Sequence, residues 1–373
     1  MKKMEVEMKE DLKEEKVLLT TRIHSINRKV RESLMEEISP FEKKFKNMTQ
    51  DIRDRVVKIA TMADEEYTMI PIQGSGTYAV EAVIGTMIGE NEKVFVISNG
   101  LNGDRIGKIC GRLKVNYTMY RGSKERAIDL ESIENILKNN DDITHIAMAH
   151  CETSSGILNS LEDISELARK YKKSLILDAT ATFGGMEFDV AKYGVDFLIA
   201  TPNECLEAIA GFAFVVARVE LLMKRKEKAH SYSLDMYDQW EYIEKTNGLW
   251  RFTPPVQAVK AFSVALDKLE KEGGIKVREK RYNKNYVTLK NGMKKLGFDF
   301  LVPEESQSPF LLSFTFPKKI DYNFEKLYKE LKEDGFVIDR DELIENHIFR
   351  IGVVGDIDSE SIEKFLKNLK KIV

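Results

Sequence analysis

Short apolar runs alternate with amphipathic stretches from about residue 55 to residue 220. The runs have the length of buried strands, and the stretches between them, such as Leu130–Lys138 and Leu161–Lys172, have helical periodicity. This alternation predicts a mostly parallel sheet with helices on both faces. The strands expected from the runs are Tyr67–Ile72, Lys93–Ser98, Val115–Tyr120, Thr144–His150, Ser174–Asp178, Asp196–Ala200 and Gly211–Ala217.

The pattern changes at Arg251-Phe252-Thr253-Pro254-Pro255, where the double proline ends the preceding element and can start a helix. A long helical stretch is expected next, over residues 256–296. The elements expected after it are a strand at 310–316, a helix at 323–334, strands at 337–340 and 348–352, and a last helix at 359–372. The chain is therefore expected to have an α/β fold in three parts: a charged N-terminal arm (1–16), a large domain (17–255) and a smaller C-terminal α+β domain (256–373).

The composition of the chain argues against several classes of binding partner. The chain has 373 residues, with 58 Lys and Arg against 61 Asp and Glu, so neither nucleic acid nor an anionic membrane is expected as a partner. It has no apolar run of about 18 residues, and its first residues alternate in charge, so neither a transmembrane helix nor a secretory signal is expected. The three cysteines form no CxxC pair, which favours a reduced, cytoplasmic protein. The five histidines show no metal-ligand spacing, so no metal site is expected.

The first candidate site is Gln73-Gly74-Ser75-Gly76-Thr77-Tyr78-Ala79, which follows an apolar run and opens a helix. Small residues before a helix let backbone N–H groups approach an anion at the positive end of the helix dipole, and the two hydroxyl groups add donors. The segment also matches a variant of the dinucleotide-binding pattern GxGxxA. That interpretation is disfavoured because no acidic residue ends a second strand about 20 residues further on. A plain structural turn is the remaining alternative.

Two further candidates follow predicted strands. Asp178 ends the run Ser174–Asp178, and Glu204 lies in a polar segment directly after Asp196–Ala200. Open α/β sheets bind ligands at the carboxyl ends of their strands, which makes both positions candidates. Asp178 has an ordinary alternative role as a cap or turn residue.

Together these segments resemble the class V pyridoxal phosphate (PLP)-dependent aminotransferases of fold type I. Within that family they are most similar to the 2-aminoethylphosphonate–pyruvate aminotransferases. The resemblance extends over residues 17 to 360. The segments that carry it are QGSGTYAVEA (73–82), HCETSSGILN (150–159), DATATFGG (178–185), ATPNECLEAIAGFAFVVAR (200–218), WRFTPP (250–255) and FRIG (349–352).

The resemblance implies cofactor-binding roles for the matching positions. Ser75, Gly76 and Thr77 would hold the PLP phosphate. Thr153 would approach the phenolic side of the cofactor. Asp178 would pair with the pyridine nitrogen and keep it protonated, which makes the ring an electron sink.

Other matching positions are assigned to the rim of the site. Thr253 would reach the cofactor phosphate of the neighbouring subunit, because such sites are shared across a dimer. Arg350 would clamp the substrate carboxylate with its guanidinium fork. Thr180, Asn203 and Trp250 are the remaining cofactor-binding candidates.

The sequence departs from the family at the position of its Schiff-base lysine. The segment reads Asn203-Glu204-Cys205-Leu206, so a glutamate stands where the lysine would attach PLP and move a proton. A carboxylate can accept a proton, but it cannot form an imine.

Further departures accompany this one. Asn102 occupies the turn (100–103) from which an aromatic ring usually stacks on the cofactor. The segment Leu18–Ile23 lacks the two prolines and the glycine that the family has there. The glycine pair that often follows the lysine segment is thinned to a single glycine in 207–211.

Three functions stay open on the sequence alone. The first is a pseudoenzyme that binds a small phosphorylated or phosphonate-bearing ligand, as a homodimer or as a heteromer with an active relative. The second is a lysine-free enzyme that holds PLP or pyridoxamine phosphate (PMP) without a covalent bond and uses Glu204 as a base. The third is a 2-aminoethylphosphonate–pyruvate aminotransferase with an altered lysine position.

Overall fold

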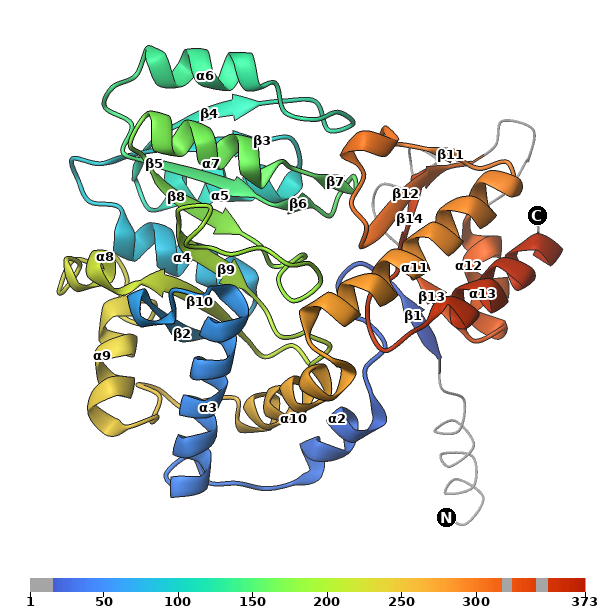
Figure 1. Cartoon of the computed structure of the whole chain (residues 1–373), viewed down its shortest axis with the longest axis horizontal. Helices are drawn as coiled ribbons and strands as arrows, with labels where there is room; N and C mark the ends of the chain where they lie inside the picture. Colours follow the sequence, from blue (N-terminus) through green and yellow to red (C-terminus); the bar gives the residue numbers. More distant parts are fainter. Residues whose placement is uncertain (1–15, 317–323, 340–347, 373) are drawn as a thin grey trace.

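A computed structural model describes residues 16–316, 324–339 and 348–372 (Figure 1). At its centre lies a seven-stranded sheet in the order β2-β10-β9-β8-β5-β3-β4. The five strands from β9 to β4 are parallel, whereas β10 runs antiparallel to both of its neighbours. The bounds are β2 (Tyr67–Gln73), β3 (Lys93–Ser98), β4 (Asn116–Arg121), β5 (His145–Ala149), β8 (Ser174–Asp178), β9 (Val195–Ala200) and β10 (Phe212–Arg218).

All seven predicted strands are present, with ends that differ from the sequence estimate by at most one residue. The central strands are buried along almost their whole length, because helices cover both faces of the sheet. The α/β fold class predicted from the alternation is thereby confirmed.

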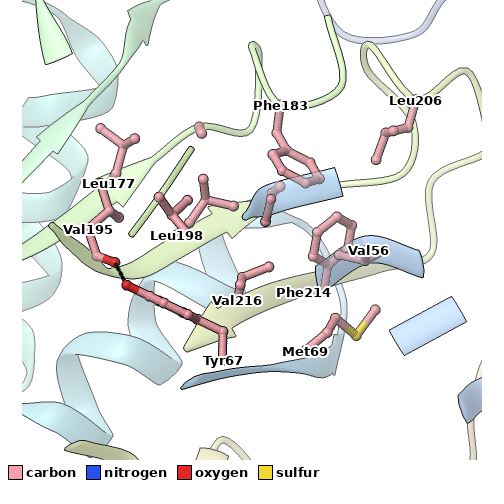
Figure 2. Packing of buried hydrophobic residues seen from close by; sticks show 14 of the residues in the cluster. Val56, Tyr67, Met69, Leu177, Phe183, Val195, Leu198, Leu206, Phe214 and Val216 are labelled. Carbon is pink, nitrogen blue, oxygen red and sulfur yellow. Dashed lines mark hydrogen bonds between the residues drawn. The ribbon is translucent and has the colours of Figure 1, made fainter. Parts of the chain in front are cut away.

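One face of the sheet is covered by α3 (Lys43–Ala60), α6 (Leu130–Lys138), α7 (Leu161–Lys170) and α10 (Val256–Glu272). Figure 2 shows part of this layer, where Phe183 and Phe214 pack edge to face with ring centroids 5.8 Å apart. The Tyr67 hydroxyl donates to the carbonyl of Val195 at 3.0 Å, so the polar end of a buried side chain is also satisfied.

The opposite face is covered by α4 (Gly76–Met87), α5 (Leu101–Arg112), α8 (Val219–Met223) and α9 (Met236–Thr246). The apolar residues of α4 pack on β9 and β10, and β9 lies beside the central strand β8. This packing places the N-terminus of α4 at the edge of the sheet where the parallel strands end.

A second, smaller unit has its own core. Its elements are β1 (Val17–Leu19), α11 (Ile275–Lys295), β11 (Asp299–Phe300), β12 (Leu311–Thr315), α12 (Phe324–Glu333), β13 (Phe336–Ile338), β14 (Ile348–Gly352) and α13 (Ser359–Ile372). Strands β11, β12 and β14 form one antiparallel sheet, and β1 pairs in parallel with β13.

The helical stretch expected over 256–296 is two helices, because Gly273 and Gly274 both have positive φ and end α10. The apolar side chains of α10 belong to the core of the large unit, whereas Leu19 of β1 belongs to the core of the small one. The packing therefore divides the chain differently from a cut at residues 255/256. The predicted arm (1–16) lies almost wholly outside the described residues.

Burial of His150 makes the fold sensitive to acid. Its ring lies between Thr182, whose Oγ1 is 2.9 Å from Nδ1, and the edge of Phe188. Burial lowers the pKa of His150 to about 4, against about 6.5 in an unfolded chain. Between these values the unfolded state binds a proton that the folded state does not, so the free energy of unfolding falls as pH drops from 6.5 toward 4.

We predict that His150→Asn weakens this pH dependence, which amounts to about 3 kcal/mol for the full shift. Urea unfolding at pH 7 and pH 5 measures the change, with His230→Asn, at an exposed histidine, as the control. Equal losses in wild type and His150→Asn would contradict the prediction.

Candidate active site

A cavity of about 520 Å³ lies where the parallel strands end, between the N-terminus of α4 and the chain segment that follows β1. This volume is typical of sites that bind small ligands. The predicted site residues that line it are Ser75, Gly76, Thr77, Asn102, Thr153, Asp178, Thr180, Asn203, Glu204 and Arg350. Positions as far apart as 75 and 350 thus surround one space, as ligand binding at strand ends requires.

The N-terminus of α4 forms the end of the cavity suited to an anion. Ser75 is the N-cap residue, but its side chain makes no capping hydrogen bond, and no acidic residue lies in the first turn. Unpaired backbone N–H groups and the helix dipole together favour a phosphate-type group at such a position. A Cβ atom on Gly76 would lie 2.6 Å from Cγ2 of Thr180, so only glycine fits between the helix and the loop after β8.

Asp178 lies at the last position of β8 and is 4% exposed. Its Oδ1 accepts a hydrogen bond from the backbone N–H of Thr180 at 3.1 Å. Burial raises the pKa of Asp178, and hydrogen bonds from Thr180 and the charge of Arg105 only partly oppose this. A ligand with a cationic or N–H group would stabilise the ionised carboxylate.

Asn102 is fixed by its neighbours. Its side-chain amide donates to the carbonyl of Cys151 at 3.1 Å, and its Oδ1 accepts from Arg105 at 2.6 Å. Among the described residues, no aromatic side chain lines the cavity. The wall on which the resemblance places a stacking ring is therefore a hydrogen-bonded amide.

Sequence reasoning missed Glu152, which lies in the quoted motif and is fully buried beside the cavity. Its two oxygens accept from the backbone N–H groups of Asn102 and Gly103 at 2.9 and 2.8 Å, so the carboxylate caps α5. Burial raises its pKa to about 6. A Cβ at Gly100 would lie 2.4 Å from Glu152 Oε2, which explains the glycine at the start of this turn.

Glu204 lies in the loop after β9, and its side chain is 15% exposed. Oε2 of Glu204 lies 2.8 Å from Nε2 of His24, whose own side chain is 1% exposed. Burial raises the pKa of Glu204, and the hydrogen bond and charge of His24 oppose this rise. The position that the resemblance assigns to the family lysine is thus a buried carboxylate–imidazole pair.

His24 belongs to the segment between β1 and α2 (Arg28–Glu32), which is attached on both sides of the cavity. The backbone N–H of Thr21 donates to Asp339 Oδ2 at 3.0 Å, and the Arg22 carbonyl accepts from the side chain of Asn203 at 3.1 Å. Thr21 and Arg22 themselves line the cavity. Sequence reasoning did not single out any of these three residues of the segment.

Arg350 extends from β14 of the small unit and is buried. Its Nη1 donates to the carbonyl of Thr153, and its Nη2 lies 3.9 Å from Asp339 Oδ2. Burial lowers the pKa of Arg350, and the nearby carboxylate of Asp339 opposes that effect. The residue therefore connects the small unit to the cavity wall.

Two predicted cofactor-binding residues do not line this cavity. Trp250 packs edge to face on Phe212, with ring centroids 5.5 Å apart, and borders a separate cavity of about 460 Å³. Thr253 is exposed. Their assigned roles, in particular the contact of Thr253 with a neighbouring subunit, stay predictions.

The described residues contain no group of three or more His, Cys, Asp or Glu side chains arranged to hold a metal ion. In the same part of the chain, no helix is long and apolar enough to cross a membrane.

Comparison with known proteins identifies the family to which this chain is similar. Residues 16–339 match the family model for class V aminotransferases. The 2-aminoethylphosphonate–pyruvate transaminase of Bacillus cereus (strain ATCC 10987 / NRS 248) is 41% identical over 355 residues, which cover 95% of this chain and 97% of that protein. The transaminase of the same name from Bacteroides fragilis (strain YCH46) is 39% identical, with 95% and 98% covered.

A bifunctional phosphonoacetaldehyde hydrolase/aminoethylphosphonate transaminase from Clostridioides difficile (strain 630) is 41% identical, but this chain spans only 56% of its length. Among solved structures, an alanine–glyoxylate aminotransferase from Nostoc sp. superposes with a TM-score of 0.87 at 22% identity, with 96% of this chain and 95% of that chain covered. A pyridoxamine–pyruvate aminotransferase from Mesorhizobium loti gives 0.86 at 21% identity, with 95% and 91% covered. At these identities the two structures support the fold alone.

The tight approach of Gly76 to Thr180 makes a prediction about stability. Gly76→Ala places a methyl group against Cγ2 of Thr180, and we expect a loss of about 1–3 kcal/mol, as is typical of overpacking. Adding Thr180→Ser removes that Cγ2 and should restore most of the loss. Thermal unfolding of the two single variants and the double variant measures this, and additive effects in the double variant would contradict it.

Proposed function

The chain belongs to the class V aminotransferase family, and from that premise we propose that it is a member that does not transaminate. In this proposal its cavity binds a small phosphorylated or phosphonate-bearing ligand, and PLP or PMP, if bound, is held without a covalent bond. The single observation that carries the proposal is the buried pair of Glu204 and His24, at the position that the resemblance assigns to the family lysine.

PLP chemistry needs a phosphate anchor, a partner for the ring nitrogen and an amine that attaches the aldehyde. The N-terminus of α4 and the carboxylate of Asp178 fit the first two requirements. Nothing fits the third, because no lysine lines the cavity among the residues that the structure describes. When bound, the cofactor would supply an electron sink for a neighbouring carbon.

The protein's own groups can bind and orient a ligand, and one of them can hold a proton. Ser75 and Thr77 would receive the anionic group, and Asp178 would fix the orientation of a ring. Glu204 can accept a proton, and His24 stabilises its ionised form. Neither Glu204 nor His24 can replace the imine that the lysine forms.

A second function has a specific observation in its favour. Burial raises the pKa of Glu204, and a raised pKa suits a carboxylate that acts as a base near neutral pH. A lysine-free enzyme that removes a proton from a bound ligand therefore remains the alternative. The names of the relatives support 2-aminoethylphosphonate and pyruvate as the first compounds to test in either case.

The experiment that tests the proposal compares wild type, Glu204→Lys and the Bacillus cereus relative for transfer of the amino group from 2-aminoethylphosphonate to pyruvate. We expect wild type to be slower than the relative by at least the roughly 10²–10⁴ that one acid–base group contributes. Glu204→Lys should also stay slow, because Asn102 and the His24 segment still differ from the family pattern. Wild-type activity near that of the relative would contradict the proposal.

The ligand-binding half of the proposal is tested by titrating wild type and Thr77→Ala with 2-aminoethylphosphonate in a calorimeter. Binding by wild type that weakens in Thr77→Ala supports it. Equal affinity in both proteins would show that the N-terminus of α4 is not the anion site.

A further inference from the structure

We propose that Glu204 binds the ammonium group of a phosphorylated or phosphonate-bearing primary amine, and so makes the cavity prefer the amine to an amine-free analogue. PMP is the ring-containing ligand of this class, and 2-aminoethylphosphonate is the alkyl one. The inference deepens the proposed function and rests on it, because it names the ligand class of the same cavity. The position that would carry a lysine amine in a lysine-containing site carries a carboxylate here. The charge that faces the ligand is therefore negative instead of positive.

The ligand's anionic end is set by α4. This helix has twelve residues, its first turn contains no acidic side chain, and the Ser75 hydroxyl is not used as a cap. Thr77, in the first turn, also lines the cavity. A dianionic phosphoryl or phosphonyl group satisfies these donors better than a neutral group does.

The ligand's cationic end is set by Glu204, which lines the same cavity as Ser75 and Thr77. Its Oε2 is paired with His24 at 2.8 Å, whereas the contact of Oε1 with the side-chain amide of Asn203 is 3.4 Å long. A carboxylate accepts hydrogen bonds at about four positions. Glu204 therefore keeps acceptor capacity for an ammonium group that enters the cavity.

The other charges in the cavity leave the amine few alternatives. Among the described lining residues the cationic ones are Arg22, Arg105 and Arg350, which repel an ammonium group. The only other carboxylate in that lining is Asp178. In PMP the protonated ring nitrogen suits Asp178, so the primary amine is left for Glu204. An aldehyde in place of the amine would offer Glu204 neither a donor nor a positive charge.

The test is calorimetric titration of the full chain at neutral pH with two matched pairs of ligands. The first pair is PMP and 4-deoxypyridoxine phosphate, which lacks the amine. The second pair is 2-aminoethylphosphonate and ethylphosphonate. We expect the amine to bind about tenfold more tightly or better in at least one pair, as a charge-assisted hydrogen bond predicts. The pair that shows the preference identifies which ligand of the class the cavity takes.

Glu204→Gln tests whether the preference comes from the carboxylate. The variant keeps the size of the side chain but removes its charge and replaces one acceptor oxygen with an NH2 donor. The amine should lose its advantage, while the amine-free ligand of the same pair should bind within about threefold of its wild-type affinity. Unchanged binding of the amine-free ligand also shows that the variant is folded.

The titrations separate a failure of this inference from a failure of the proposed function. If wild type binds the phosphate compounds but shows no preference for the amine, this inference is overturned and the proposed ligand site stands. A preference that persists in Glu204→Gln overturns it equally. If none of the four compounds binds, both the inference and the ligand-binding half of the proposed function are overturned.

Discussion

A carboxylate buried in the loop after a central strand has to be compensated, and this requirement organises the cavity. The partner of Glu204 is His24, which is 180 residues away in the sequence. To bring the imidazole there, the segment after β1 must lie beside the loop that follows β9. The same segment is attached to the small unit through the β1–β13 pair and through Thr21 and Asp339. The contact between Glu204 and His24 thus links the two units at the site, as does that between Arg350 and the Thr153 carbonyl.

The cavity combines features that fit the family with features that do not. The glycine at position 76, the N-terminus of α4 and the carboxylate of Asp178 suit a phosphorylated ligand with a ring nitrogen. The side of the cavity formed by Asn102 and Glu204 contains neither an aromatic side chain nor a lysine among the described residues. In our proposal, the charge at this end of the cavity is opposite to that of a lysine-containing site, while the anchoring end is retained. Altered chemistry on a retained binding frame is the simplest account of that division.

Local signals in the sequence were sufficient for the sheet and for most of the cavity. Runs of apolar residues predict where strands end, as at Asp178, and parallel strands bring their carboxyl ends to one edge of the sheet. Long-range contacts left no such signal: nothing near residue 24 identifies a partner at residue 204. The two adjacent glycines, Gly273 and Gly274, are visible in the sequence. The end of α10 at this point depends on the positive φ angles that they adopt. Thr253 could not be placed at the cavity, because the role assigned to it requires a second subunit.

We propose that this member of the family does not attach PLP through a lysine in its cavity. The most direct test is to add PLP, reduce the protein with borohydride, and locate any modified lysine by peptide mass analysis. We expect no stoichiometric adduct on a single lysine, and no absorption band of a protonated PLP imine after desalting. A single lysine modified in full, together with that band, would contradict it and would return the chain to the ordinary aminotransferases.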